Sequence, residues 1–531
     1  MRKHISMLLI IIVVLSLSIG YSALNTDLSI SGEAIVRADN DIRITDIILK
    51  ETLNGAIEDY NPKYTVDTTT SYVTLPSSSE IVYEITISNN TGKRIIVNDI
   101  VSTLSNENIS YEISGLEINE VYSGNEIKFT LTIVNNSNVT QSGTINLEYD
   151  LEVFEGYIVT LVQNNEVLKN NISKDMAKVN YPVNTNNDIV LRCDYGSVPS
   201  IKDGMLTIDN ISNDTTCSFY NNLENATSEA NNSKNYLLML NDYKTTKTIS
   251  IAENQNFELD LNGKLIESSA RTISNSGTLI VTDTSFGGTI SNTGNNSQVI
   301  YNNGGNFTLN NGQIKSTESC DVWYCSSLFN INNSLVNIDP IIETSFNSDG
   351  SYKTGVYINQ TYGIALWNHS GTVSNIYGGE YRMFTNSDMV SWQLFVCSTC
   401  DTLNIYDAHT IGEKYSSPIR GQQSGNINVY GGTFENPTST RYLIATDADF
   451  DGTINLYGGT GIGGGSNIGI ANTGVNSEIN ICNFTFENLR YDVGSNGGVI
   501  RYKDGVNWIN GSSPTLYPGV NITLDNSLVC K

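Results

Sequence analysis

Apolar and polar residues alternate with a period of two along most of this chain, and between residues 363 and 488 the alternation becomes a repeat. A six-residue motif recurs: it begins with a small or apolar residue, followed by Asn, an apolar residue and Tyr, and three copies end in Gly-Gly. The five copies are residues 374–379, 403–408, 427–432, 454–459 and, with Cys482 in place of Tyr, 479–484. The tyrosines and Cys482 lie 29, 24, 27 and 25 residues apart. A near-constant period of this size predicts stacked repeats. Because no helical periodicity separates the copies, the pattern predicts a parallel β-solenoid that turns its corners at glycine.

The same alternation divides the rest of the chain. In residues 24–153, apolar residues recur at every second position in three runs, 81–87, 127–133 and 145–153, which predicts the half-buried strands of a β-sandwich. Residues 154–223 contain three shorter runs, 157–161, 205–208 and 215–219, and predict a small β module. Residues 224–531 are expected to be solenoid throughout. The predicted fold class is therefore all-β, with a C-terminal β-helix behind two smaller β units.

The repeat also predicts what the solenoid shows to solvent. If the Ile, Leu or Val of each motif points inward, its neighbours on both sides point outward, and adjacent coils lie about 4.8 Å apart. The asparagines then form one external column and the tyrosines a second column beside it; these residues are Asn375, Asn404, Asn428, Asn455 and Asn480, and Tyr377, Tyr406, Tyr430 and Tyr457.

Two interpretations of these columns stay open. Stacked amides and rings stabilise β-solenoids from coil to coil, so the columns can be purely structural. As a binding platform, the ring faces would pack on sugar C–H surfaces while Asn404, Asn428 and Asn455 bond to hydroxyl groups. The predicted ligand residues of that platform are these asparagines and Tyr377, Tyr406, Tyr430 and Tyr457. The predicted partner is a polysaccharide, or a glycan of a host or bacterial surface.

Three residues beyond each tyrosine lies a further column, in which Glu380 and His409 occupy neighbouring coils. They are the one acid–base pair that the repeat register generates, and hence the candidate catalytic residues. An exposed pair without a catalytic role is the competing interpretation.

A candidate cation site lies at Asp447, Asp449 and Asp451, followed by Gly452. The spacing matches positions 1, 3, 5 and 6 of a calcium loop, but position 12 is Gly458 where the bidentate Glu is required. An EF-hand is thus excluded, and a weaker Ca²⁺ site or a solvated acidic loop remains. No other cofactor is expected.

The formal net charge of −26 narrows the partners further. It excludes nucleic acid as a partner and disfavours an anionic lipid surface. Basic residues 2–4, the apolar stretch 7–19 and the small residues before Ala23 predict a signal peptide over residues 1–23. If this segment stays uncleaved, it is the only expected membrane contact. The predicted location is extracellular, either secreted or at the cell surface.

Eight cysteines fit an oxidising compartment. Local pairing predicts Cys193 with Cys217, Cys320 with Cys325, and Cys397 with Cys400, which leaves Cys482 and Cys530 as the last two. Zinc is the alternative at the CxxC pair, Cys397 and Cys400, although a second such pair with histidines is lacking.

Several segments resemble known bacterial surface proteins. Residues 259–263 (LDLNG), 277–283 and 300–305 resemble coils of right-handed parallel β-helix domains of the pectate-lyase-like superfamily, in the branch found on surface proteins of Gram-positive gut bacteria. Residues 20–32 are similar to the mature N-termini of exported Gram-positive surface and matrix proteins, and residues 86–92 to immunoglobulin-like spacer domains. The resemblance implies a fold that hosts lyases, hydrolases, adhesins and phage fibres, so it does not choose an activity.

From these observations we expect an adhesin-like or scaffold protein that presents a β-helix face to glycans or to another surface. A polysaccharide lyase or glycoside hydrolase of the β-helix type is the alternative, and a spacer without ligand is a third possibility. Clustered carboxylates around bound Ca²⁺ would favour the enzyme, and a flat Asn and Tyr face would favour binding.

Overall fold

The computed structural model describes residues 42–530 except 91–93, 117–119, 122–123, 155, 164–165, 174–178, 183–186, 212, 296, 317–324, 362, 384–392, 413–415 and 439–440. The chain divides after Glu155 into two compact units, unit 1 and unit 2, and each is described by itself. The predicted signal peptide lies outside the described residues. Among the helices that are described, none has the length and apolar character needed to cross a bilayer.

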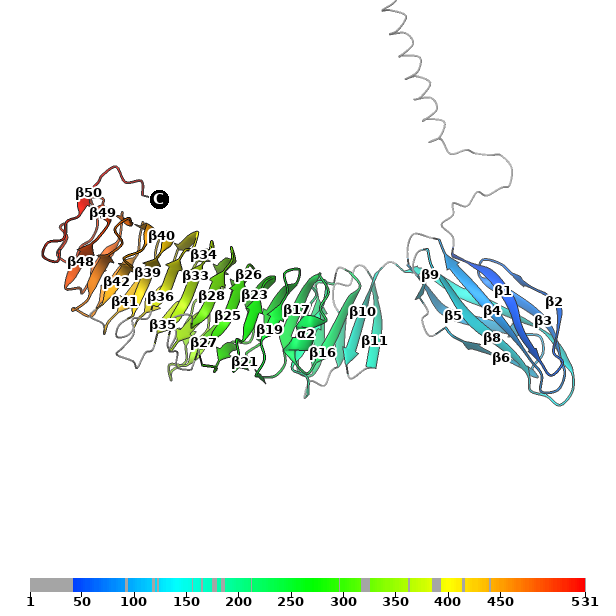
Figure 1. Ribbon diagram of the computed structural model, residues 1–531. Coiled ribbons are helices and arrows are strands. Elements are labelled where there is room, and N and C mark those ends of the chain that lie inside the picture. Colours follow the sequence, from blue (N-terminus) through cyan, green and yellow to red (C-terminus); the bar gives the residue numbers. More distant parts are fainter. Residues whose placement is uncertain are drawn as a thin grey trace, which may run out of the picture. The chain divides into compact units, whose positions relative to one another are not determined.

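Unit 1 is a pair of antiparallel sheets around one core (Figure 1). The first sheet, as far as it is described, has the order β1 (Ile42–Leu53), β4 (Glu80–Asn89), β8 (Glu126–Asn135), β6 (Ile109–Ser114). The second has the order β2 (Ile57–Tyr64), β3 (Thr68–Leu75), β9 (Gln141–Phe154), β5 (Arg94–Leu104), β7 (Glu120–Val121). The alternating residues of β4, such as Ile81, Tyr83 and Ile85, are fully buried between the sheets. The predicted strands are therefore confirmed, and their alternating apolar residues face the core except Val153 at the end of β9, which is 37% exposed.

Unit 2 starts with a small β module that joins the solenoid without a break. Strands β11 (Glu166–Ser173), β10 (Gly156–Gln163), β16 (Thr215–Tyr220) and β13 (Val190–Cys193) lead directly into the first solenoid strand, β17 (Lys234–Met239). Strands β12 (Val179–Pro182), β15 (Met205–Asp209) and β14 (Val198–Lys202) form a separate small sheet, and α2 (Leu223–Ser228) follows. Because β13 pairs antiparallel with β17, the module covers the edge of the first coil. It thus caps one end of the solenoid.

The solenoid is a right-handed-type parallel coil of about eleven turns, and its strands form three sheets. Sheet 1 continues from β17 through β20 (Asn256–Asp260), β23 (Thr278–Thr282), β26 (Asn306–Leu309), β29 (Leu335–Ile338), β34 (Val373–Ile376), β37 (Thr402–Ile405), β40 (Ser424–Val429), β43 (Asp451–Leu456), β46 (Glu478–Ile481), β49 (Val499–Tyr502) and β50 (Thr523–Leu524).

Sheet 2 contains β18 (Tyr243–Thr245), β21 (Leu265–Ser268), β24 (Thr289–Asn292), β27 (Gly312–Ser316), β32 (Val356–Gln360), β35 (Glu380–Met383), β38 (His409–Ile411), β41 (Thr433–Asn436), β44 (Thr460–Gly463) and β47 (Thr485–Glu487). Sheet 3 contains β19 (Ile249–Ile251), β22 (Ile273–Asn275), β25 (Gln298–Asn303), β28 (Ser326–Ile331), β33 (Ile364–His369), β36 (Gln393–Ser398), β39 (Ser417–Gln422), β42 (Tyr442–Thr446), β45 (Ile468–Asn472) and β48 (Tyr491–Asn496). Each coil visits the three sheets in this order, and one apolar core runs between them. The predicted all-β class and C-terminal β-solenoid are confirmed.

The turn from sheet 1 to sheet 2 explains the LDLNG motif. The buried Asp260 carboxylate accepts hydrogen bonds from the backbone N–H groups of Asn262 (2.8 Å) and Thr284 (3.0 Å). Asn262 and Gly263 both have positive φ, 48° and 72°, which turns the chain sharply. A Cβ on Gly263 would lie 2.9 Å from the carbonyl oxygen of Phe286. The motif therefore encodes a corner, not a catalytic group.

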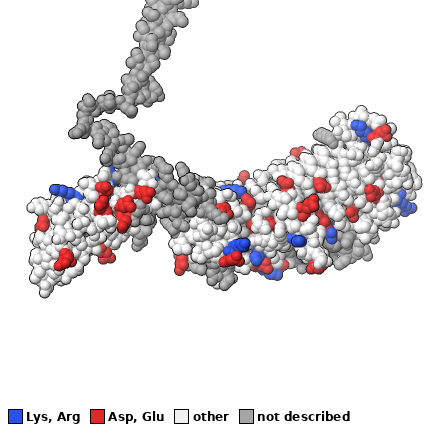
Figure 2. All heavy atoms as spheres, turned by 180° about the vertical axis from the view of Figure 1, so that it is seen from behind, with Lys and Arg blue, Asp and Glu red and all other residues white. Residues whose placement is uncertain are grey.

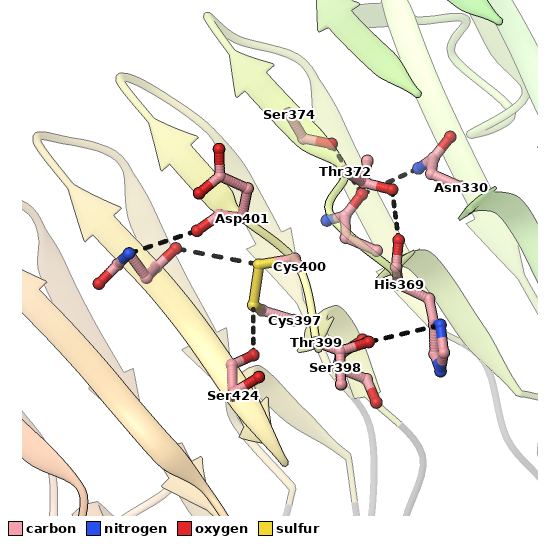
Figure 3. Close-up of a disulfide and its surroundings, with 12 residues drawn as sticks. Asn330, His369, Thr372, Ser374, Cys397, Ser398, Thr399, Cys400, Asp401 and Ser424 are labelled. Carbon is pink, nitrogen blue, oxygen red and sulfur yellow. Dashed lines mark hydrogen bonds between the residues drawn. A yellow bond between two sulfur atoms is a disulfide. The ribbon is translucent and has the colours of Figure 1, made fainter. Parts of the chain in front are cut away.

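The turn from sheet 3 to sheet 1 is built on buried amides. Asn275, Asn302, Asn330 and Asn368 occupy the same register position in successive coils and are fully buried. The next residue in this column is Cys397, which forms a disulfide with Cys400 across the turn (Figure 3). A Cβ on Gly425 of the following coil would lie 2.5 Å from the Cys397 Sγ atom, so only glycine fits there.

The predicted pairings Cys193–Cys217, Cys397–Cys400 and Cys482–Cys530 are confirmed, so a disulfide and not zinc occupies the CxxC segment. Cys325 is also disulfide-bonded. Cys320 lies outside the described residues.

The C-terminal segment covers the other end of the solenoid, where the red trace of Figure 1 loops beyond the last coils. Trp508 is buried and stacks on Phe486 with ring centroids 5.3 Å apart. The buried Asp492 carboxylate accepts hydrogen bonds from the backbone N–H groups of Ile509 (3.2 Å) and Thr515 (2.8 Å). Both ends of the solenoid are thus capped, as stacked repeats require for solubility.

We predict that replacing Cys482 and Cys530 by Ser loosens this C-terminal cap. The disulfide spans 48 residues, and a bridge of that loop length stabilises a fold by about 4 kcal/mol in the chain-entropy model. Amide hydrogen exchange measured by mass spectrometry should accelerate in residues 503–530 and stay unchanged in β34, β37 and β40. Val529→Ala, at the exposed neighbour of Cys530, is the control that leaves exchange unchanged. Equal exchange in the double variant and the native protein would contradict the prediction.

Candidate functional site

The outward side of β34, β37, β40 and β43 forms what we call the asparagine–tyrosine face. Its positions are Val373, Asn375 and Tyr377; Thr402, Asn404 and Tyr406; Asn426, Asn428 and Tyr430; and Thr453, Asn455 and Tyr457. None of these residues is charged, although the chain carries a formal charge of −26. Figure 2, a view of one side of the molecule, shows acids only as separate patches on a largely uncharged surface.

The asparagines of this face form a continuous hydrogen-bonded ladder. The Nδ2 group of Asn404 donates to Oδ1 of Asn375, that of Asn428 to Asn404, and that of Asn455 to Asn428, each at 2.9 Å. The ladder extends at both ends, to Asn480 at 3.0 Å and to Asn337, also at 3.0 Å. The predicted external column is confirmed, and Asn337 is a member that the sequence prediction missed.

The tyrosines form a parallel stack beside the ladder. Ring centroids are 4.8 Å apart for Tyr377 and Tyr406, 4.9 Å for Tyr406 and Tyr430, and 5.1 Å for Tyr430 and Tyr457. The angles between the ring planes are 4°, 8° and 25° in the same order. The predicted column is therefore confirmed.

This stacking corrects the predicted use of the ring faces. Each inner ring, Tyr406 or Tyr430, lies between two nearly parallel neighbours, so its faces are turned toward other rings and not toward a ligand. The edges and hydroxyl groups remain accessible, and Tyr406 is 40% exposed. The face is consequently suited to hydrogen bonding more than to stacking on sugars.

The tyrosine stack has two different ends. At one end the next position is Cys482, which the disulfide to Cys530 buries. At the other end, Ile338 of the preceding coil pairs with Ile376, so Asp339 occupies the position that corresponds to Tyr377. Tyr377 therefore has a ring neighbour, Tyr406, on one face only. Partial burial, the neighbouring phenol and Asp339 together raise the pKa of Tyr377. Tyr377, at 44% exposed, is the one ring of the stack with a face left for contact at this end.

Many polar groups of the face remain unpaired. The hydroxyl groups of Tyr377, Tyr406, Tyr430 and Tyr457 make no hydrogen bond within the described part of the chain. The amides of Asn375, Asn404, Asn428 and Asn455 each donate one of their two N–H groups to the ladder, and the second has no acceptor among the described residues. Each of the four coils thus has one phenol hydroxyl and one amide N–H that no described group pairs.

Residues 339–355, between β29 and β32, leave the repeat and are called the excursion. Because of this insertion, Asn337 and Asn375 are 38 residues apart in the sequence, whereas the other consecutive asparagines of the ladder are 24 to 29 residues apart. Strands β30 (Ser345–Phe346) and β31 (Tyr352–Thr354) pair within it. Thr344 Oγ1 donates to the carbonyl of Val356 at 2.8 Å, and Phe346 packs edge-on against Tyr357. The excursion is therefore held firmly against sheet 2.

An open recess of about 470 Å³ lies between the excursion and the solenoid turn that follows the tyrosines. Its lining comes from residues 340–344, 377–380 and 407–409. Ile341 and Ile342 are exposed, at 66% and 40%, while Glu343 and Asp407 add carboxylates. The structure thus brings three predicted site residues, Tyr377, Glu380 and His409, to one recess.

The predicted pair Glu380 and His409 does lie on neighbouring coils, inside a longer chain of contacts. Nδ1 of His409 is 3.6 Å from Oε2 of Glu380, and its Nε2 is 3.0 Å from Oε1 of Glu435. Arg382 forms an ion pair with the other oxygen of Glu380, and its guanidinium lies 4.8 Å from the ring centroid of Phe346. The hydrogen bond to Glu380 is the largest cause that raises the pKa of His409, and Glu435 raises it further.

This arrangement stabilises the imidazolium form of His409. Because both ring nitrogens face carboxylates, the ring has no free lone pair with which to act as a general base. The Glu380 side chain is only 10% exposed and is shared between Arg382 and His409. Glu380 and His409 therefore form a fixed, ion-paired part of the lining of the recess.

The three acids of the predicted cation site do not converge. Asp447 forms an ion pair with Arg420, whose Nε lies 2.6 Å from Oδ1, and Asp449 and Asp451 are exposed. Phe450 between them is buried, and its ring packs on Gly421 and Gly452, which turns the flanking acids outward. Within the described residues no group of three His, Cys, Asp or Glu side chains could hold a metal ion. Asp447 and Asp449 line a different recess, of about 490 Å³, together with Arg420 and Arg441.

Sequence reasoning missed Glu343, Arg382, Asp407 and Glu435 as neighbours of the candidate pair. The signal for Arg382 and Glu435 was present, because each lies two residues beyond a position of the column and so on the same side of its strand. No period predicts Glu343, which belongs to the excursion.

Comparisons of this chain with protein-family models, with curated proteins and with solved structures found no match.

We predict that Asn428→Ala destabilises the solenoid by about 2 kcal/mol, since it removes two ladder hydrogen bonds worth roughly 1 kcal/mol each. Urea unfolding should show a lower midpoint with an unchanged slope. Asn426→Ala is the matched control, because that side chain faces outward on the same strand and has only a 3.4 Å bond to the carbonyl of Asp401. A loss as large in the control would refute a specific role for the ladder.

His409 should titrate above 6.5, the ordinary histidine value, and Glu435→Gln should lower its pKa. Because the folded-state pKa is raised, the ion pairs stabilise the fold fully below pH 6.5 and lose this effect as pH rises through the raised pKa. NMR titration of the imidazole C–H signals measures this. His369, whose pKa burial lowers, is the internal control and should not respond. Titration of His409 at or below 6.5 would show that the carboxylates do not hold it charged.

Proposed function

We propose that this protein is an exported, cell-surface glycan-binding protein, and that its asparagine–tyrosine face is the binding surface. The observation that carries the proposal is the regular set of unpaired phenol hydroxyls and amide N–H groups on an uncharged face. A polysaccharide offers hydroxyl groups in similar regular repetition, and neutral donors and acceptors bind them without the cost of desolvating charges. An adhesin-like or matrix-scaffold role follows from such binding.

The recess supports the same function at one end of the face. Tyr377 contributes both to the stack and to the recess, so one ligand can contact the two together. The free face of its ring and the exposed Ile341 and Ile342 provide apolar surface, while Glu343 and Asp407 provide acceptors for hydroxyl groups. A combination of apolar walls and a few polar groups is typical of ligand sites.

The sequence resemblances support the location and the lineage that we propose. Residues 1–23 have the pattern of a signal peptide, and the disulfides fit an oxidising compartment. The LDLNG corner and the parallel coil are compatible with a right-handed β-helix of the pectate-lyase-like superfamily. We therefore assign the chain to surface proteins of Gram-positive gut bacteria as part of the proposal.

A polysaccharide lyase or glycoside hydrolase of the β-helix type is the second candidate. It is favoured by the three carboxylates that line the recess beside His409, namely Glu343, Glu380 and Asp407. It is disfavoured by the contacts of Glu380 and His409, which leave neither group free to transfer a proton.

Replacing Tyr406 and Tyr430 by Ala should weaken retention of the full-length protein on the polysaccharides that it binds. Two hydroxyl contacts of roughly 1 kcal/mol each correspond to about a thirty-fold weaker affinity. The measurement is a pull-down against insoluble plant, host and bacterial polysaccharides, with and without Ca²⁺, together with an assay for new reducing ends.

Tyr60→Ala with Tyr64→Ala is the matched control, because these exposed strand tyrosines, 70% and 45% exposed, belong to unit 1. Circular dichroism must show that both variants are folded. Unchanged retention in the Tyr406 and Tyr430 variant would remove the face as the binding surface. New reducing ends that disappear in Glu380→Gln would replace the proposal by the enzyme, and no retention on any polysaccharide would leave a spacer.

A further inference from the structure

The spacing of the asparagine–tyrosine face is uniform along the solenoid axis. Successive ring centroids are 4.8, 4.9 and 5.1 Å apart, and successive ladder amides make the same 2.9 Å bond. The ring planes differ by 4° between Tyr377 and Tyr406 and by 8° between Tyr406 and Tyr430, so this part of the face is almost without twist, and the angle rises to 25° only at Tyr457. Side-chain ladders are known to flatten sheets in this way. The face is therefore a straight surface on which one hydroxyl and one amide recur at an even spacing, once per coil.

A ligand that contacts every coil must advance along the axis by the same distance at each of its units. A chain of pyranose sugars joined by β-1,4 bonds is a straight ribbon, because both bonds leave the ring equatorially, and its rise per sugar is close to the distance between strands. Chains with α-1,4 or β-1,3 bonds wind into helices and lose this match after one or two sugars. Alternate sugars of the β-1,4 ribbon are turned over, so four coils accommodate two disaccharide repeats.

The charge of the recess narrows the class of glycan further. The recess at the Tyr377 end is lined by Glu343, Glu380 and Asp407 and by His409, and its lining includes no Lys or Arg. Because Arg382 and His409 pair with Glu380, the carboxylates of Glu343 and Asp407 make the recess acidic. A uronic-acid polymer would place its carboxylates beside these acids and would be repelled. Neutral sugars, or sugars with an amino group, carry no such penalty.

We propose that the asparagine–tyrosine face binds an unbranched, uncharged β-1,4-linked glycan parallel to the solenoid axis, one sugar per coil, with the chain entering the recess beside Tyr377. This inference rests on the proposed function and specifies its ligand. The edges of the tyrosines and the free amide N–H groups bond to the hydroxyl groups on one side of the ribbon. The first sugar to pass the stack contacts the open face of Tyr377.

The test is isothermal titration of the full-length protein with cello- and chito-oligosaccharides of two to six sugars. The association constant should rise by about five-fold per added sugar up to four sugars and then level off, a factor that corresponds to one net hydrogen bond per coil. Malto-, laminari- and oligogalacturonate hexamers are the comparison ligands, and each should bind at least ten-fold more weakly than the β-1,4 hexamer.

Tyr430→Phe, which keeps the ring stack and removes one hydroxyl, should weaken the four-sugar ligand about five-fold. Tyr517→Phe, at an exposed tyrosine of the C-terminal cap, is the matched control and should change nothing. Binding without dependence on length, or equal binding of the comparison hexamers, would overturn this inference and leave the proposed function standing. Absence of binding to every oligosaccharide and to the insoluble polysaccharides would overturn both.

Discussion

The pairing of each coil with the next, in register, is the constraint on which the rest of this structure depends. A single coil leaves a row of backbone N–H and C=O groups without partners, and only an identical path in the next coil pairs them all. Positions that carry one residue type in one coil therefore carry a similar type in the next. The asparagine ladders inside and outside the solenoid, the tyrosine stack and the glycines at the corners are consequences of this constraint. The two caps are a further consequence, because the first and last coils have one unpaired edge each.

The candidate site arises where the repeat is interrupted. The asparagine–tyrosine face is regular and could be built at any coil, but the excursion occurs once among the described coils that carry the face, and it gives the face a distinct end. Phe346 of the excursion meets Arg382, and Arg382 holds Glu380 against His409. The insertion thus fixes both the wall of the recess and the charge distribution within it. A binding surface with one defined end differs from a uniform spacer in this respect.

Most buried carboxylates of unit 2 accept hydrogen bonds from backbone N–H groups. Asp260, Asp283 and Asp492 are buried at corners or under the cap, and each accepts hydrogen bonds from backbone N–H groups. Burial raises the pKa of Asp283 and of Asp492. Backbone donors at these turns would otherwise remain unpaired in the interior, so all three acids are structural, and the raised pKa values of Asp283 and Asp492 do not mark a functional site. The neutral hydroxyls and amides of the asparagine–tyrosine face differ from these acids, because they lie outside the core and no described group pairs with them.

The sequence by itself determined the solenoid, the inward residues of its coils and the two external columns, whereas the choice among cysteine pairings, and between disulfide and zinc at Cys397 and Cys400, was made by the structure. A side-chain period of two, repeated every 24 to 29 residues, leaves one arrangement that buries every Ile, Leu and Val of the motifs. The same register placed Glu380 beside His409. Tertiary structure alone decided that the tyrosines cover one another's faces, because ring orientation depends on the distance between coils. It also decided that Phe450 turns inward and separates the three acids, and that the excursion forms a recess beside Tyr377. These outcomes depend on packing between residues with no fixed spacing in the chain, which a periodic pattern does not encode.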